Sequence, residues 1–102
     1  MPGNLYSDAY AVFVGVVRHA RVTVGLTQEE LARALGRPQS FVSKSERRER
    51  RIDVVEFIEI ARALGLDPKH LLAEVERSMS GSEEPTREPQ GTREAGRPRR
   101  AR

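Results

Sequence analysis

Residues 27–46 constrain the fold most, because they specify the end of one helix and the start of another. Thr27 and Glu30 have the spacing of a capping box, in which each side chain accepts a hydrogen bond from the other residue's amide at a helix N-terminus. Gly36 suits the left-handed residue that ends a helix. Pro38 then favours the first turn of a new helix. The sequence therefore predicts two short helices joined by a tight glycine turn.

Apolar residues recur at three- and four-residue spacing in three further segments, which predicts helices with one buried face. The first should start near Ser7 or Asp8, and Asp53 should cap the fourth. A fifth should open at Asp67 and Pro68, with its apolar side formed by Leu71, Leu72 and Val75. The other residues expected to face the core are Tyr6, Tyr10, Phe13, Val17, Ala20, Val24, Leu31, Leu35, Val54, Phe57, Ile60, Ala61 and Leu64. The predicted fold class is all-α, a compact domain of five helices and no strand.

The composition changes near Arg77. Between Ser78 and Arg102 the only apolar residues are Met79, Ala95 and Ala101. Such a segment cannot bury enough apolar surface to offset the entropy lost on ordering. We therefore expect a domain over residues 1–77 and a disordered, polar, Arg-rich tail over residues 78–102.

Several classes of site are absent from the sequence. There is no cysteine, and His19 and His70 stand far apart without carboxylates at a metal-ligand spacing, so we expect no metal and no cofactor. No catalytic constellation is present, which argues against an enzyme. The apolar run 12–17 is too short to span a bilayer and no secretion signal precedes it, so we expect a cytoplasmic, nucleoid-associated protein without a membrane partner.

The two short helices also carry a family pattern, in which a small residue, a glycine and an apolar anchor fix the crossing of two helices. The residues that carry it are Arg21, Gly25, Leu26, Thr27, Gln28, Leu31, Ala32, Gly36, Gln39, Ser40, Val42, Ser43, Lys44 and Glu46. In this region the chain resembles the lambda-repressor-like (XRE-type) helix-turn-helix family, over roughly the first three-quarters of its length. The resemblance implies binding of double-stranded DNA and an ion pair between Arg21 and Glu46.

The second short helix would turn one polar face toward the bases of the DNA. At 100° per residue, Gln39, Ser40, Ser43 and Lys44 fall within one arc of about 140°. Gln39 could pair with adenine, Lys44 with guanine or a phosphate, and Ser43 with either kind of partner. The alternative is an ordinary solvated helix face.

Positive charge gathers around this helix. Seven arginines and lysines but only two glutamates lie between Arg33 and Arg51, which favours a surface that faces phosphates. Gln28, in the first turn of its helix, should bind a phosphate through its side chain and backbone amide. The DNA-binding residues predicted in total are Gln28, Arg37, Gln39, Ser40, Ser43, Lys44, Arg47 and Arg48.

Two positions in and after the second short helix depart from the family pattern, and a third lies between its inner and outer faces. Arg48 stands where the family usually has glycine. A left-handed arginine there would cost about 1 kcal/mol relative to glycine, and the alternatives are that the loop turns differently or extends the helix. In any of these cases Arg48 adds a phosphate ligand. Ser45 stands where the family often has a larger apolar side chain, which predicts a less firmly anchored helix. Phe41 lies between the inner and outer faces and either packs on the fourth helix, the reading we prefer, or touches a thymine methyl.

The preferred function is a sequence-specific DNA-binding transcriptional regulator, a homodimeric repressor of an inverted-repeat operator. Leu71, Leu72, Val75 and Met79 either form the dimer interface or complete the core. The alternative is an antitoxin or adaptor that mainly binds a protein partner through the Arg-rich tail and uses DNA binding for autoregulation.

Overall fold

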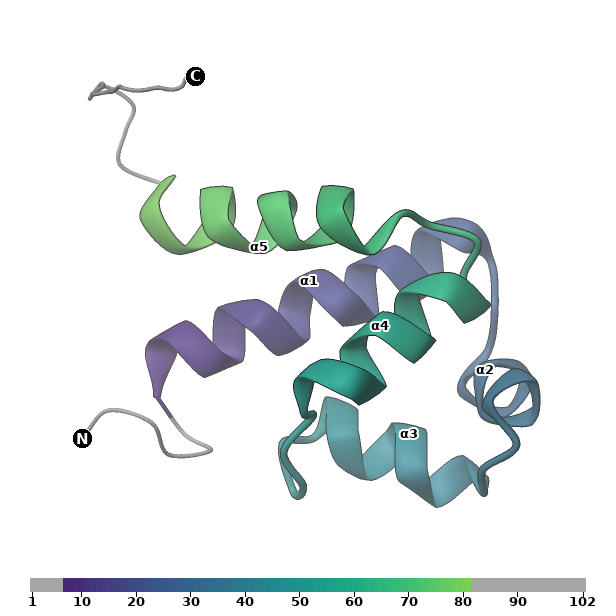
Figure 1. Cartoon of the computed structure of the whole chain (residues 1–102). Coiled ribbons are helices and arrows are strands. Elements are labelled where there is room, and N and C mark those ends of the chain that lie inside the picture. The colour runs from purple at the N-terminus through teal and green to yellow at the C-terminus, as the bar shows by residue number, and fades with distance from the viewer. Residues whose placement is uncertain (1–6, 82–102) are drawn as a thin grey trace.

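A computed structural model describes residues 7–81 and contains five helices (Figure 1). They are α1 (Asp8–Val24), α2 (Gln28–Leu35), α3 (Gln39–Glu46), α4 (Val54–Ala63) and α5 (Pro68–Gly81). No strand occurs among the described residues. The all-α, five-helix prediction is confirmed. Helix α5 continues past Arg77, and the predictions for Tyr6 and for the tail beyond Gly81 lie outside the described residues.

The helix ends follow local capping chemistry. Thr27 Oγ1 accepts from the Glu30 amide at 3.0 Å, and the Glu30 carboxylate accepts from the Thr27 amide at 2.9 Å. Asp53 forms the same reciprocal pair with Glu56 at the start of α4. Gly36 ends α2 with φ 68°, a backbone conformation that other residues adopt only with strain. The predicted capping boxes and glycine turn are confirmed.

The helices form two groups around one core. Helix α5 packs along α1, and α2 packs against α3. In Figure 1, α3 and α5 lie at opposite edges of the molecule with α1 and α4 between them. Helix α3 therefore has one side against the rest of the domain and an opposite side open to solvent.

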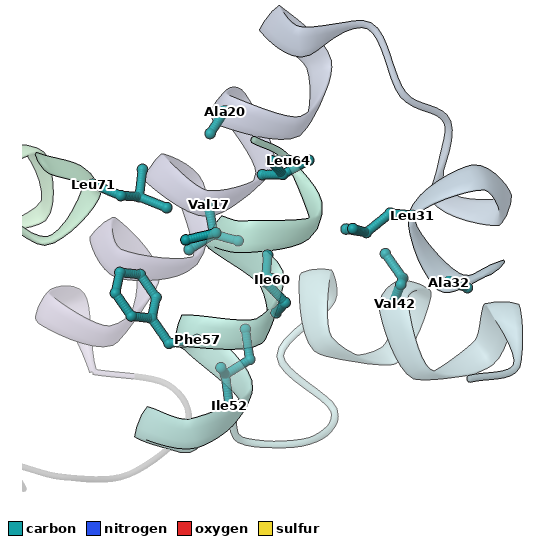
Figure 2. Packing of buried hydrophobic residues seen from close by; sticks show 11 residues of the cluster. Val17, Ala20, Leu31, Ala32, Val42, Ile52, Phe57, Ile60, Leu64 and Leu71 are labelled. Atoms are coloured by element: carbon teal, nitrogen blue, oxygen red, sulfur yellow. The ribbon is translucent and has the colours of Figure 1, made fainter. Parts of the chain in front are cut away.

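The core joins every helix, as Figure 2 shows for its buried cluster. Its members are Val17, Ala20, Leu31, Ala32, Val42, Ile52, Phe57, Ile60, Ala61, Leu64 and Leu71. Helix α3 contributes Val42 alone to this cluster, and Figure 2 places that side chain next to Leu31 and Ala32 of α2. Val42 is thus the one buried apolar side chain of α3, and it fits against α2.

Two expectations about the core were wrong. Val24 is 42% exposed and Val54 is 69% exposed, and each is a terminal residue of its helix. The sequence left two alternatives for the apolar residues of α5, and they divide: Leu71 and Val75 are buried in the core, whereas Leu72 is 55% exposed. Sequence periodicity gives the direction of a side chain but not how far the opposing surface extends.

No single helix in the described part of the chain is long and apolar enough to cross a membrane, although α1 and α2 together, with a bend of 98° between them, meet the same length and composition criteria.

Candidate nucleic-acid interface

Helix α3 presents the polar face that the sequence predicts. Gln39, Ser40 and Lys44 are exposed and Ser43 is partly exposed. On the inner side Val42 is 3% exposed and Ser45 is 2% exposed. These six side chains come from a helix of only 8 residues, so one face is fixed against the domain while the other remains available to a ligand.

A buried ion pair joins α1 to the end of α3. Arg21 Nε donates to Glu46 Oε2 at 2.7 Å and Arg21 Nη2 donates to Glu46 Oε1 at 3.0 Å. Both side chains are less than a tenth exposed. Arg21 Nη1 also donates to the carbonyl of Leu26 at 2.7 Å, so the guanidinium is satisfied on two sides. The pair that the family resemblance implies is present, and its bidentate geometry fixes the direction of α3.

The same carboxylate also fixes two glutamines at the outer surface. Gln28 Nε2 donates to Glu46 Oε1 at 2.9 Å, and Gln39 Nε2 donates to Gln28 Oε1 at 3.3 Å. A chain of hydrogen bonds therefore runs from the core ion pair to the first residue of α3. The side-chain nitrogen and oxygen of Gln28 therefore both have protein partners. The contact of Gln28 with a phosphate stays a prediction, and the backbone amide in the first turn of α2 supports it.

Ser45 is buried at a position where the family often has a larger apolar side chain, and its hydroxyl group is hydrogen-bonded within the protein. Its hydroxyl donates to the carbonyl of Phe41 at 2.7 Å, four residues earlier on α3. Its oxygen also accepts from Arg50 Nη1 at 3.3 Å. The contact with Arg50 links this buried serine to the following loop, whereas the contact with Phe41 lies within α3 itself. The weaker anchoring of α3 stays a prediction.

Arg48 keeps the backbone conformation that a glycine would adopt. Its φ is 62°, the only positive value among the described residues other than glycines. The amide of Glu49 donates to the carbonyl of Lys44 at 2.8 Å, which closes the end of α3. The alternatives of a different turn or a longer helix are therefore wrong, and the loop accepts a strained arginine instead.

The basic residues after α3 differ in their partners. Arg47 donates to Glu49 through Nε and Nη2 at 2.9 and 3.1 Å, and this hydrogen bonding lowers the pKa of the Glu49 carboxyl and raises that of Arg47. Both side chains are at least half exposed, so a phosphate can compete for Arg47. Lys44 and Arg48 have no ion pair within the described range of the chain.

Phe41 packs, as preferred from the sequence, and it also holds two arginines. Its partly buried ring rests against the core cluster. The Arg37 guanidinium carbon lies 4.4 Å from the ring centroid and that of Arg50 lies 4.5 Å from it. Arg50 in turn makes two hydrogen bonds to the Glu56 carboxylate, at 3.0 and 2.9 Å. We call Arg37, Phe41, Arg50 and Glu56 the arginine stack. No local pattern in the sequence indicates this cluster, because its members lie up to 19 positions apart.

No group of three or more histidine, aspartate or glutamate side chains among the described residues is arranged to hold a metal ion. His19 and His70 are both exposed.

Comparison with known proteins agrees with this geometry. The family model for the helix-turn-helix matches residues 17–71, more than half of the chain. A search of curated proteins found no match. Among solved structures, an XRE-family-like protein from Pseudomonas syringae pv. tomato is 50% identical, with a TM-score of 0.64 over 67% of this chain and 83% of that one.

Two further structures share the fold. The restriction-modification controller protein C.AhdI from Aeromonas hydrophila is 36% identical, with a TM-score of 0.54 over 58% of this chain and 86% of that one. The clp gene regulator ClgR from C. glutamicum is 24% identical, with a TM-score of 0.65 over 74% of this chain and 97% of that one, and so supports the fold alone. The chain therefore belongs to the XRE-type helix-turn-helix family of DNA-binding regulators.

Proposed function

We propose that the protein is a sequence-specific transcriptional repressor that binds an inverted-repeat operator as a homodimer, with α3 in the major groove. The observation that carries this proposal is the fixed orientation of α3. The buried Arg21–Glu46 pair holds one side of the helix, while Gln39, Ser40 and Lys44 extend from the other side. A helix held in this way can enter the groove without first losing conformational freedom.

The residues of α3 would divide between bases and phosphates. The side chain of Gln39 donates one N–H to Gln28 and keeps its second N–H and its oxygen for a base. A donor and an acceptor of this kind are the groups that an adenine edge requires. Lys44 would donate to guanine or to a phosphate, and Ser40 and Ser43 would complete the contacts with bases. Arg37, Arg47 and Arg48 flank this face and would bind phosphates.

The proposed dimer would use the exposed apolar side of α5. Leu72 and Met79 are 55% and 54% exposed, and their seven-residue spacing places them on one side of that helix. A second copy of the chain would cover these side chains. Two-fold symmetry would then present two copies of α3 to half-sites about 34 Å apart along one face of the duplex.

Similarity to a protein named as a restriction-modification controller supports a regulatory role for this chain. The proposed mode of regulation is repression, in which a dimer bound over a promoter would exclude polymerase.

The decisive experiment is selection of bound duplexes from a random-sequence library by the full chain. We expect enrichment of a two-fold symmetric motif, with affinity that falls steeply as salt rises. Substitution of Gln39 by alanine should remove the preference at one base pair of each half-site and leave binding to unrelated duplexes unchanged. A library from which no motif is enriched would refute the proposal.

A further inference from the structure

The arginine stack combines residues from four parts of the chain. Arg37 lies in the turn between α2 and α3, Phe41 on α3, Arg50 in the following loop and Glu56 on α4. From the geometry we propose that Phe41 is a positioning residue for DNA binding: its ring holds the Arg37 guanidinium in place as a phosphate ligand at the entry of α3. The inference rests on the proposed function.

The two arginines have different electrostatic situations. Arg50 donates to Glu56 twice and to Ser45. The hydrogen bonds to Glu56 raise the pKa of Arg50 and lower that of the Glu56 carboxyl. The charge of Arg50 is therefore neutralised inside the protein. Arg37 is exposed and forms no ion pair with any described carboxylate, and its charge acts on Glu56 only as the smallest of the influences that lower the pKa of that carboxyl. The stack thus contains one arginine that braces the ring and one whose charge is available to an anion.

The ring restricts Arg37 in a defined way. A guanidinium stacked on an aromatic face keeps its N–H groups in its own plane, parallel to the ring, so these groups can still donate to a phosphate at the edge of the stack. The Arg37 backbone is also fixed, because its amide donates to the carbonyl of Ala32 at 2.9 Å. An arginine held at both ends loses less side-chain entropy when it binds a phosphate.

The position fits this role. Arg37 directly precedes Pro38, which begins α3 without a side-chain cap. The first amides of that helix and the Arg37 guanidinium therefore lie at the same end of α3, where its dipole also favours an anion. A backbone phosphate at this end would have both kinds of donor.

A double-mutant cycle tests the proposal, with the duplex that the wild-type chain enriches as the probe. We expect Phe41→Leu to weaken binding by about two- to fivefold, the strength of an exposed cation–π contact. In an Arg37→Ala background the same substitution should have no further effect. Phe41→Tyr, which keeps the ring, should bind like the wild type. Arg37→Ala alone should reduce the salt-dependence exponent by about one unit, whereas Phe41→Leu should leave it unchanged.

Two controls separate positioning from general loss of packing. Phe13→Leu removes an aromatic ring from α1 that packs on Tyr10 and Phe57, so it should lower the melting temperature without changing DNA affinity. In the free protein, NMR should show ring-current shifts of the Arg37 side-chain protons that disappear in Phe41→Leu. Equal effects of Phe41→Leu in both backgrounds would overturn the inference and leave the proposed function intact, whereas a wild type that binds no duplex would overturn both.

Discussion

At the scale of single residues, the buried Arg21–Glu46 pair is the most sensitive contact. Arg21→Ala would leave the Glu46 carboxylate buried with Gln28 as its remaining close donor, at a cost of about 3 kcal/mol. For a domain of this size that corresponds to a fall in melting temperature of more than about 10 °C. Arg18→Ala is the matched control, since Arg18 lies 3.9 Å from the same carboxylate but is 61% exposed. Equal melting of Arg21→Ala and wild type in calorimetry would contradict this assignment.

Arg48 combines backbone strain with a proposed contact to DNA. Arg48→Gly should stabilise the fold by about 0.5–1 kcal/mol, because glycine adopts the left-handed conformation without strain. The same substitution should weaken DNA binding and flatten its salt dependence by about one unit. Arg47→Gly is the control for the stability effect alone: φ there is −88°, so glycine should destabilise the fold, while the loss of this second proposed phosphate ligand should also weaken DNA binding. Urea denaturation and anisotropy titrations measure the two effects, and an unchanged salt slope would show that Arg48 does not touch DNA.

At the scale of elements, the Arg50–Glu56 pair links the loop after α3 to the first turn of α4. Hydrogen bonds from Arg50 and from the Asp53 amide hold the pKa of the Glu56 carboxyl below its ordinary value of 4.5. A carboxyl with a depressed folded-state pKa stabilises the fold above its ordinary pKa, and this contribution is lost as the pH falls through the folded-state pKa.

We therefore expect Glu56→Gln to destabilise the protein by about 1 kcal/mol at neutral pH, a value reduced for the partial exposure of Arg50. The difference from wild type should stay constant down to about pH 5 and shrink in more acidic solution. Denaturation curves across this range measure it. Glu59→Gln removes an exposed carboxylate from the same helix and should show no such dependence, and a difference that grew on acidification would contradict the argument.

The elements were more predictable than their contacts. Thr27, Asp53 and Gly36 specify helix ends through local chemistry, so the five helices could be derived from short stretches of sequence. The Arg21–Glu46 pair followed from the family resemblance. The arginine stack could not be derived, because its members come from a turn, two helices and a loop whose relative positions depend on the packed core. Val24 and Val54 were misassigned for the same reason.

At the scale of the whole molecule, the dimer proposal depends on the exposed side of α5. Leu72→Glu should place a carboxylate in the proposed interface and convert a dimer to monomers in sedimentation velocity, with loss of binding to the two-fold operator. Ser80→Glu adds the same charge to an exposed polar position of α5 and should leave the dimer intact. A wild-type chain that sediments as a monomer at all concentrations would exclude this interface.

The uncapped start of α3 has a consequence for hydrogen exchange. Pro38 leaves the amides of Gln39 and Ser40 without a side-chain acceptor, whereas Thr27 protects the amide of Glu30 at the start of α2. In the free protein the two α3 amides should therefore exchange with deuterium rapidly, and a bound phosphate should slow them while Glu30 changes little. Residue-resolved exchange by NMR would then mark which helix end meets the DNA backbone, and unchanged rates at Gln39 and Ser40 would place the phosphate elsewhere.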